Sequence, residues 1–316
     1  MEKIDNLDMK IIKQLLLNSR QSDTQIAKKV RRSKQVVSYR IRNLVKEKII
    51  KYYFTALNLS KLGLISHVRV FFKLQNADLV KEKEIIEFLS NNDKIPSVSK
   101  LGGRFDIAIV LTTKNNFEVH RIIREIMDKY GDYLSNYELS FRVNYHRHKE
   151  KEEKVVYTKE IEVFELNDIE KKLLSILTKD ARMNVTEIAS KLKLPVSTTI
   201  SKIKKLEKEG IIQEYTAYPD LDKLNLKMYH ILVSMKNVST DDEHKLNELI
   251  VEKNVDSVAF SLGRWDVEFI LIVKNSEEVH DFTIKLRSLF SNIQDIEIME
   301  IFKEFKYDFS ICLNLV

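Results

Sequence analysis

The feature that most constrains the fold of this chain is an internal repeat. When the 316-residue sequence is shifted by 162 positions, residues 7–62 align with residues 169–224 without a gap. After a two-residue deletion the offset becomes 160, and GRFD at residues 103–106 matches GRWD at residues 263–266. A period this long indicates a tandem duplication and not a solenoid. We therefore expect that one two-domain module occurs twice, as copy one in the N-terminal half of the chain and copy two in the C-terminal half.

Each copy begins with a helical part. In copy one, apolar residues recur at helical spacing over residues 7–16, and Ser22 begins a capping box that starts a second helix. Ser33 can cap a third helix at residues 34–48, and residues 49–58 then suit a short two-stranded wing. Three short helices followed by a wing predict a winged helix-turn-helix.

The second part of each copy alternates strands and helices. In copy one, alternating apolar residues predict a strand at residues 66–75, and a helix follows at about residues 80–90. Residues 97–112 are typical of two strands joined at glycines, and a further helix and strand complete the copy. The order β-α-β-β-α-β is the ferredoxin-like arrangement, and copy two repeats it. The fold class is therefore α+β, with each helix-turn-helix followed by a ferredoxin-like βαββαβ domain.

The repeat also sets the expected domain boundaries. The first winged helix-turn-helix covers residues 1–60, the first ferredoxin-like domain 61–150, a linker 151–165, the second winged helix-turn-helix 166–222 and the second ferredoxin-like domain 223–316. A charged stretch, HRHKEKEEK, lies near the join of the two copies. Its His146 and His148 are spaced by one residue in a polar setting, where histidines are usually solvated, so we expect no metal site.

Composition excludes several classes of protein. No apolar run reaches the roughly 18 residues that a membrane-spanning helix requires. The first residues carry acids among their apolar side chains, unlike a signal peptide, so we expect a cytoplasmic protein. The single cysteine, Cys312, excludes an internal disulfide framework and a cysteine-rich zinc site, and we expect it to be a small buried hydrophobe.

Two adjacent glycines precede an apolar strand in copy one, as in a nucleotide-binding loop. Such a loop needs a helix directly after the glycines, whereas DIAIVL at residues 106–111 is typical of a strand. We therefore interpret Gly102 and Gly103 as the turn of a hairpin whose next strand begins at Asp106. No cofactor is expected.

The third helix of copy one carries many hydrogen-bond donors on its outward face. Residues 20–51 hold eleven Lys or Arg against two acids, a net charge of +9, although the whole chain has only +6. Such side chains reach phosphates and base edges, and such a helix fits the major groove of DNA. The predicted DNA-binding residues of copy one are Arg31, Arg32, Lys34, Gln35, Ser38, Tyr39, Arg40, Arg42 and Lys46.

Copy two gives a weaker signal. Its matching window, residues 182–213, holds seven basic residues against three acids, a net charge of +4, and Lys202 stands where copy one has Arg40. We expect copy two to bind DNA more weakly or differently, so that the two copies read unequal half-sites. Its predicted DNA-binding residues are Ser197, Thr198, Ser201, Lys202, Lys204 and Lys205.

These motifs resemble those of the Lrp/AsnC family, the leucine-responsive or feast/famine transcription regulators. The matching positions are Leu7-Asp8, Arg20, Ile26-Ala27, Ser33, Val37, Arg40-Ile41, Leu44 and Ile49-Ile50. Both copies fit, so the resemblance covers nearly the whole chain. It implies a transcription regulator whose C-terminal domains, of the RAM type, pair subunits and bind small effectors, commonly amino acids. Family chains with one copy form dimers, so this chain resembles a covalent pseudo-dimer that assembles further into an oligomer.

The resemblance also implies where an effector binds. Family effector sites lie near the Gly-x-x-Asp hairpin, which occurs once in each copy. The predicted effector-binding residues are Gly103, Arg104, Asp106, Gly263, Arg264 and Asp266. The alternative for the glycines and aspartates is a purely structural role in the turn. The expected partners are double-stranded DNA, a small effector and other copies of this chain, and we expect no catalytic residue.

Two other functions stay open. Siroheme decarboxylases are similar in their two-part module, so an enzyme that acts on a haem-like molecule is the alternative from another class. His120 and His280, which the repeat pairs, would be its first candidates, although a surface or capping role is the simpler interpretation. The strands FDIAIVL and WDVEFIL show no surrounding cluster of Tyr, Arg and His. A ligand-sensing scaffold that no longer binds DNA is the third interpretation, against which the charge of the first helix-turn-helix argues.

Overall fold

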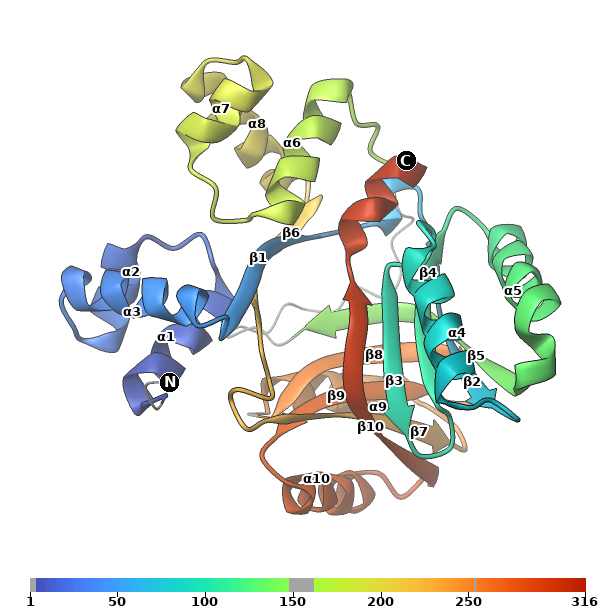
Figure 1. Cartoon of the computed structure of the whole chain (residues 1–316). Coiled ribbons are helices and arrows are strands. Elements are labelled where there is room, and N and C mark those ends of the chain that lie inside the picture. The colour runs from blue at the N-terminus through green and yellow to red at the C-terminus, as the bar shows by residue number, and fades with distance from the viewer. Residues whose placement is uncertain (1–3, 148–161, 253) are drawn as a thin grey trace. The chain divides into compact units, whose positions relative to one another are not determined.

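The computed structural model describes residues 4–147, 162–252 and 254–316. It contains two compact units (Figure 1). Unit 1 comprises Met1–Gly63 and Glu162–Asn225, and unit 2 comprises Leu64–Ile161 and Leu226–Val316. Each unit therefore joins one part of copy one to its counterpart from copy two. Most of the expected linker at residues 151–165 lies outside the described residues.

Unit 1 contains two three-helix heads. The helices of the first head are α1 (Asn6–Leu17), α2 (Asp23–Val30) and α3 (Lys34–Lys46), and those of the second head are α6 (Asp168–Lys179), α7 (Val185–Leu192) and α8 (Val196–Lys208). In the first head, Ile11, Leu15, Ile26 and Ile41 belong to one buried core. The helical spacing of apolar residues therefore places one face of each helix inward, and the three helices expected in each head are confirmed.

The expected helix starts in copy one are confirmed. At α2, Ser22 Oγ accepts a hydrogen bond from the Gln25 amide, and the Gln25 side chain accepts one from the Ser22 amide. Ser33 Oγ accepts a hydrogen bond from the Val36 amide and caps α3. Caps of this kind satisfy amide groups that lack a partner in the helix, and each stabilises the folded state by about 1 kcal/mol.

The wing differs from the expectation. Strand β1 (Ile50–Leu57) pairs antiparallel with β6 (Ile212–Pro219) of copy two, so the two-stranded sheet takes one strand from each copy. The expectation of a two-stranded wing within residues 49–58 is therefore wrong. Copy one continues from β1 through η1 (Ser60–Leu62) into unit 2, so the second copy satisfies the backbone groups along β1.

Unit 2 repeats the β-α-β-β-α-β order, which confirms the expected fold class. The elements of copy one are β2 (Ser66–Leu74), α4 (Leu79–Asn91), β3 (Ser97–Gly102), β4 (Ile107–Thr113), α5 (Asn116–Tyr130), η2 (Gly131–Tyr133) and β5 (Leu134–Arg147). Those of copy two are β7 (Lys227–Met235), α9 (Thr240–Glu248), η3 (Leu249–Val251), β8 (Val255–Gly263), β9 (Val267–Val273), α10 (Ser276–Leu289), β10 (Ile293–Tyr307) and η4 (Phe309–Leu315).

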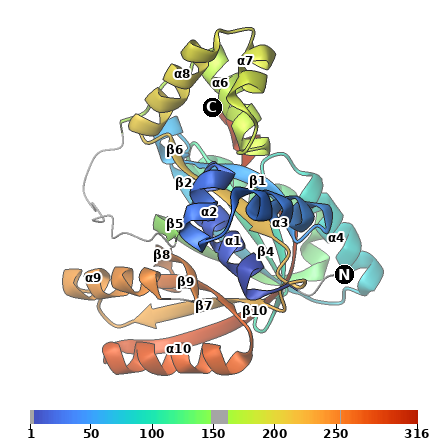
Figure 2. The same cartoon turned by 90° about the vertical axis from the view of Figure 1, so that its left-hand side faces the viewer.

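The two sheets of unit 2 close into one barrel. The strand order is β10-β3-β4-β2-β5-β8-β9-β7, so the edge strands of each copy pair with those of the other. Helices cover the outside of the barrel, and Figure 2 shows α9 and α10 along the sheet of copy two. An apolar cluster that includes Phe71, Phe105, Trp265 and Met299 fills part of the interior. Closure leaves these strands without free edges, which otherwise promote aggregation.

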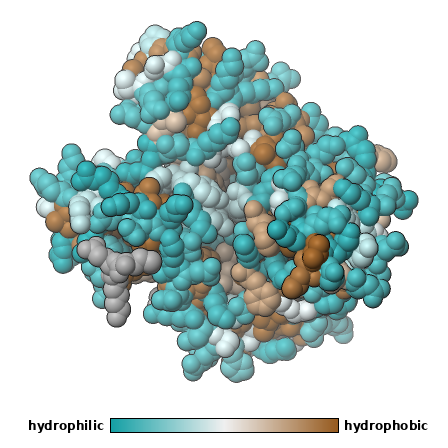
Figure 3. All heavy atoms as spheres, in the orientation of Figure 1, coloured by the Kyte–Doolittle hydropathy of each residue, from teal (hydrophilic) through white to brown (hydrophobic). Residues whose placement is uncertain are grey.

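Side chains elsewhere follow the expected division between core and surface. Cys312 lies in η4 with no exposed area, and burial raises the pKa of its thiol to about 12, which confirms it as a buried hydrophobe. The face of the molecule in Figure 3 is mostly hydrophilic. Among the described residues, no helix combines the length and apolar character needed to cross a bilayer.

Candidate functional site

The outward face of α3 is basic and open to solvent. Lys34, Gln35, Arg42 and Lys46 are exposed, and Tyr39 has 51% of its surface accessible. The opposite face of the helix carries the buried residues of the core. Arg31 and Arg32 are also exposed, in the turn between α2 and α3. These seven predicted DNA-binding residues therefore lie on one helix and the turn before it, where a groove of DNA can reach them.

Two other predicted DNA-binding residues of copy one are engaged within the head. Arg40 is half-buried and forms ion pairs with Asp5 at 3.0 Å and with Asp8 at 3.1 Å. Ser38 Oγ donates a hydrogen bond to Asp23 Oδ2 at 2.5 Å. These contacts fix α3 against α1 and α2, so both side chains orient the helix in this structure.

Helix α8 of copy two presents a less basic face. Ser197, Ser201 and Lys204 are exposed, whereas Thr198 and Lys202 are half-buried. Lys205 Nζ lies 3.0 Å from the buried carboxylate of Glu170, and 5.1 Å from the centre of the Phe164 ring.

The charge of Glu170 holds Lys205 in place. Burial acts to raise the pKa of Glu170, but its hydrogen bond with Lys205 and the amide of Asn167 hold the pKa below the ordinary value. The carboxylate therefore keeps its charge and holds Lys205 by an ion pair.

Two arginines join the heads reciprocally. Arg20 Nη1 donates to the carbonyl oxygen of Ala181 at 2.7 Å, and Arg182 Nη1 donates to that of Ser19 at 2.6 Å. Arg182 also forms an ion pair with Asp23 at 2.8 Å. With the β1–β6 pairing, these contacts hold the two heads as one body. Arg20 is one of the positions that match the Lrp/AsnC motifs, and Arg182 is its counterpart in copy two; nothing in the sequence indicated this role.

The two Gly-x-x-Asp hairpins have similar backbone roles in both copies. Asp106 Oδ2 accepts a hydrogen bond from the Leu74 amide at 2.8 Å, and Asp266 Oδ2 accepts one from the Met235 amide at 2.7 Å. Each aspartate thus fastens its hairpin to the end of the neighbouring strand. Gly103 and Gly263 have φ angles of +131° and +141°, which side chains rarely adopt. A Cβ at Gly263 would also lie 2.6 Å from a backbone oxygen.

The arginines of the two hairpins meet at one carboxylate. Arg104 Nη1 lies 2.9 Å from Glu297 Oε1, and Arg264 Nη2 lies 3.1 Å from the same atom. Each guanidinium also lies beside the aromatic ring that follows it, that of Phe105 or Trp265. Two positive charges therefore face one negative charge, and 41% and 37% of the two arginine side chains remain accessible. This site can bind an anion.

The barrel interior holds a cluster of charged residues. His230 Nδ1 lies 3.1 Å from Arg69 Nη1, and His230 Nε2 lies 3.2 Å from Glu268 Oε2. Ser140 Oγ donates a hydrogen bond to the other oxygen of Glu268. His230 and Glu268 are fully buried, and Arg142 of β5 adds a nearby positive charge.

The environment fixes the charges of this cluster. Burial, together with the charge of Arg69, lowers the pKa of His230 to about 4. Burial acts to raise the pKa of Glu268, but the hydrogen bond from His230 and the charge of Arg69 hold it below its ordinary range. At neutral pH His230 is therefore neutral and Glu268 is ionised.

The sequence showed no cluster of Tyr, Arg and His around these strands, but the structure brings two of these residue types together there, as Arg69, Arg142 and His230. The members of this cluster come from both copies and occupy single positions in otherwise apolar strands. Arg69 lies in β2, His230 in β7 and Glu268 in β9. Closure of the barrel brings them together. The only signal in the sequence was a charged or polar residue at an inward strand position.

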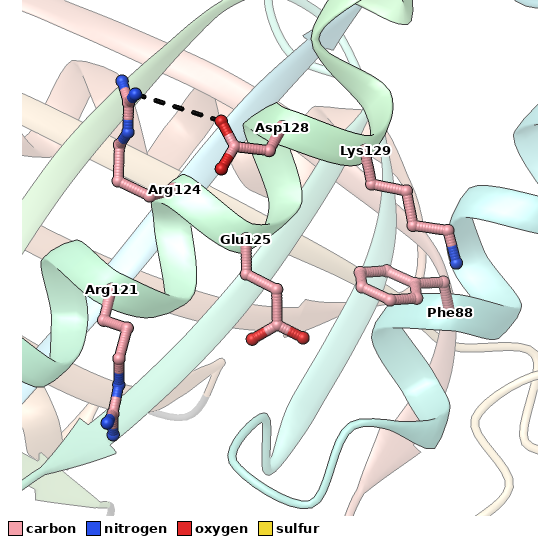
Figure 4. Close-up of a pocket in the computed structure, with 6 residues that line it drawn as sticks. All are labelled: Phe88, Arg121, Arg124, Glu125, Asp128 and Lys129. Atoms are coloured by element: carbon pink, nitrogen blue, oxygen red, sulfur yellow. Dashed lines mark ion pairs between the residues drawn. The ribbon is translucent and has the colours of Figure 1, made fainter.

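An open groove of about 530 Å³ lies between α4 and α5. Its lining residues are Phe88, Arg121, Arg124, Glu125, Asp128 and Lys129 (Figure 4). Lys129 Nζ lies 4.2 Å from the centre of the Phe88 ring, and Arg124 lies 3.9 Å from Asp128. The predicted effector residues lie elsewhere, on the hairpins.

The histidines singled out in the sequence do not gather at one site. His120 and His280 are exposed on α5 and α10. The side chain of His146 and all of His148 lie outside the described residues. Among the residues that the structure describes, no group of three or more His, Cys, Asp or Glu side chains is arranged to hold a metal ion.

Comparison with known proteins agrees with this architecture. A family model described as winged helix-turn-helix DNA-binding matches residues 4–51 and 166–213. An uncharacterized HTH-type transcriptional regulator of Pyrococcus furiosus is 34% identical over 127 residues, which are 39% of this chain and 85% of the relative. A similar regulator of Pyrococcus horikoshii is 32% identical over 127 residues, again 39% and 85% of the two chains.

One solved structure is similar over nearly the whole chain. The siroheme decarboxylase NirDL superposes with a TM-score of 0.62 at 16% identity, covering 95% of this chain and 92% of that one. At this identity the likeness shows the fold alone. The family model matches once in each copy, and the Pyrococcus regulators align over most of their own length. The chain therefore belongs to the Lrp/AsnC family of HTH-type transcription regulators, with the family module present twice.

Proposed function

We propose that this regulator recognises a specific DNA sequence mainly through α3 and that a small effector that carries a carboxylate, such as an amino acid, modulates its binding. The basic face of α3 is the observation that carries the first part. Lys34, Gln35 and Arg42 would reach base edges or phosphates from that face. Binding is expected to be strongly electrostatic, with log K falling by roughly 0.9 against log salt for each phosphate contact.

The join between the heads supports recognition of two half-sites at a fixed separation. Arg20, Arg182 and the β1–β6 pairing hold α3 and α8 in one unit. Because α3 and α8 present different side chains, the two half-sites should differ in sequence, and the first should contribute most of the affinity. A palindrome follows only when two identical heads are related by symmetry.

The two hairpin arginines support the effector part of the proposal. Arg104 and Arg264 share the carboxylate of Glu297, so a ligand carboxylate could exchange with it and bind both guanidinium groups. A change at this site would alter occupancy of DNA only if the effector binds two arrangements of the protein with different affinity. Further assembly of chains through unit 2 would provide such arrangements.

The DNA part is tested by enrichment of genomic duplex fragments on the purified chain, with and without a mixture of amino acids, followed by sequencing. The variant Lys34→Ala/Arg42→Ala should lose about 100-fold in affinity, because each charged contact contributes on the order of 1–2 kcal/mol. Lys83→Ala/Arg287→Ala is the matched control, since it removes two exposed positive charges from unit 2. Equal losses in both variants would show that α3 has no special role.

The fold likeness to a siroheme decarboxylase favours a second candidate, an enzyme that acts on a tetrapyrrole. One solved form of that protein is a complex with an iron-uroporphyrin III analogue. In the present chain, Arg69, His230 and Glu268 contact one another inside the barrel. Arginine and histidine are the residue types that chemistry on a haem-like molecule would use, but here the histidine is buried and the two are engaged with one another. Addition of an iron porphyrin to the purified protein distinguishes the two: a shifted Soret band at equimolar ratio would favour the enzyme.

A further inference from the structure

We propose that the charges buried in the barrel dictate which sheets pair: the sheet of copy one accepts only the sheet of copy two. A copy-one sheet would not pair with a second copy-one sheet, nor a copy-two sheet with its like. Each sheet therefore pairs only with the sheet of the other copy.

The strand ladders identify which residues are counterparts in the two copies. Two residues, one from each copy, are counterparts when they lie opposite equivalent residues of the neighbouring strands in their own copy. By this criterion four pairs of counterparts lie around the buried charges: Arg69 and His230, Ala108 and Glu268, Ser140 and Met299, Arg142 and Ile301. In every pair except the first, one member is charged or polar and the other is apolar.

These differences are complementary across the interface. Ser140 of copy one donates a hydrogen bond to Glu268 of copy two. Their counterparts, Met299 and Ala108, lie together in the apolar interior cluster. The two sheets therefore meet at two equivalent places. At one place the polar Ser140 and Glu268 face each other, and at the other the apolar Met299 and Ala108 do.

Pairing of two copy-one sheets would destroy this match. Ser140 would face Ala108 at both places, and two copies each of Arg69 and Arg142 would enter the interior without the carboxylate of Glu268. Removing one partner of a buried ion pair leaves an uncompensated charge in a medium of low polarity, which is strongly destabilising.

Pairing of two copy-two sheets would fail for the opposite reason. Glu268 would face Met299 at both places, and neither Arg69 nor Arg142 would be present to balance the two carboxylates. In the native barrel, the positive charge of Arg69 lies 3.8 Å from Glu268. Only the mixed pairing brings the buried carboxylate and the buried arginines together.

The experiment uses reciprocal exchange of counterparts in the full chain. The first variant gives copy two the copy-one residues: His230→Arg, Glu268→Ala, Met299→Ser and Ile301→Arg. The second gives copy one the copy-two residues: Arg69→His, Ala108→Glu, Ser140→Met and Arg142→Ile. The third combines all eight changes and so inverts the pattern. Trp265, the single tryptophan, is buried in the barrel and reports its thermal unfolding.

Each fourfold variant is expected to lower the Tm of unit 2 by about 10 °C or more, or to abolish its cooperative transition. The eightfold variant should recover most of the native Tm, because it restores a mixed pairing. If the effects of the substitutions simply add, the eightfold variant will be less stable than either fourfold variant. That outcome overturns the proposal, provided that it does not arise from poor repacking of the eight side chains.

A smaller cycle decides that case. Arg69→Met and Glu268→Met each leave one buried charge without its partner, whereas the double variant removes both charges. The double variant should be at least as stable as the less stable single variant. Losses in Tm that simply add would show that these charges do not couple the two copies, and would overturn the proposal.

Discussion

His230 illustrates how one residue depends on both copies. Positive charges approach it from Arg69 of β2 and Arg142 of β5, and the carboxylate of Glu268 approaches from β9. His67, on the same strand as Arg69, is half-buried, and this partial burial with the charge of Arg142 lowers the pKa of His67 to about 4. Both imidazoles are therefore neutral in the folded protein at neutral pH.

This environment makes the stability of unit 2 sensitive to acid. Unfolded histidine has a pKa near 6.5, so below that pH the unfolded chain binds protons that His67 and His230 do not. Their contribution is full above pH 6.5 and is lost as the pH falls toward 4, by roughly 3 kcal/mol for each histidine. Glu268, whose pKa is lowered, acts in the same direction below its unfolded value of 4.5.

Thermal melts of the full chain between pH 7 and pH 4 measure this effect. The Tm reported by Trp265 fluorescence should fall across this window, and His230→Gln should make the fall shallower. His120→Gln is the control, because His120 is exposed on α5. A Tm that is constant down to pH 4.5 would contradict the neutral state of these histidines.

Glu297 is the residue on which the effector proposal can be tested. Glu297→Gln removes the internal carboxylate but keeps the shape of the side chain, so both guanidinium groups become more available to a ligand. Amino acids should then raise the Tm of the variant at about tenfold lower concentrations than they need with the native chain. Arg104→Ala/Arg264→Ala should abolish the response. A variant that responds as the native protein does would place the effector elsewhere.

The pairing of β1 with β6 and the reciprocal arginines join the two helix-turn-helix heads into one unit. Each head has its own core, yet their spacing depends on Arg20 and Arg182 together with eight-residue strands. Affinity for a double site should therefore exceed affinity for one half-site because the second head binds at a high effective concentration.

The double variant Arg20→Ala/Arg182→Ala tests this role. It should weaken binding to a double site by about 10-fold while leaving binding to a single half-site unchanged, since it loosens the heads but does not alter the outward face of α3. Competition assays with the two lengths of duplex provide the measurement. Lys34→Ala is the comparison, because it should weaken both by the same factor. A loss on the single half-site in the arginine variant would indicate damage to the head itself.

Local sequence patterns predicted the helices and strands but not the contacts between the two copies. Helix caps at Ser22 and Ser33 act over three residues, so they can be read from the sequence. The partner of β1 lies some 160 residues away, and nothing near β1 indicates it. The meeting of Arg104 and Arg264 at Glu297 likewise requires the closed barrel, because hydrophobic alternation only tells which way each strand faces.

The closed barrel also affects how this regulator can change over time. In an assembly of identical subunits, every substitution occurs on both sides of the symmetry axis. Here each position of the barrel and of the heads is encoded once, and the strand edges of one copy are taken up by the other. Under the proposed function, a mutation that alters the DNA preference of α8 leaves α3 untouched, so one half of the molecule can acquire a new target while the other half keeps the old one.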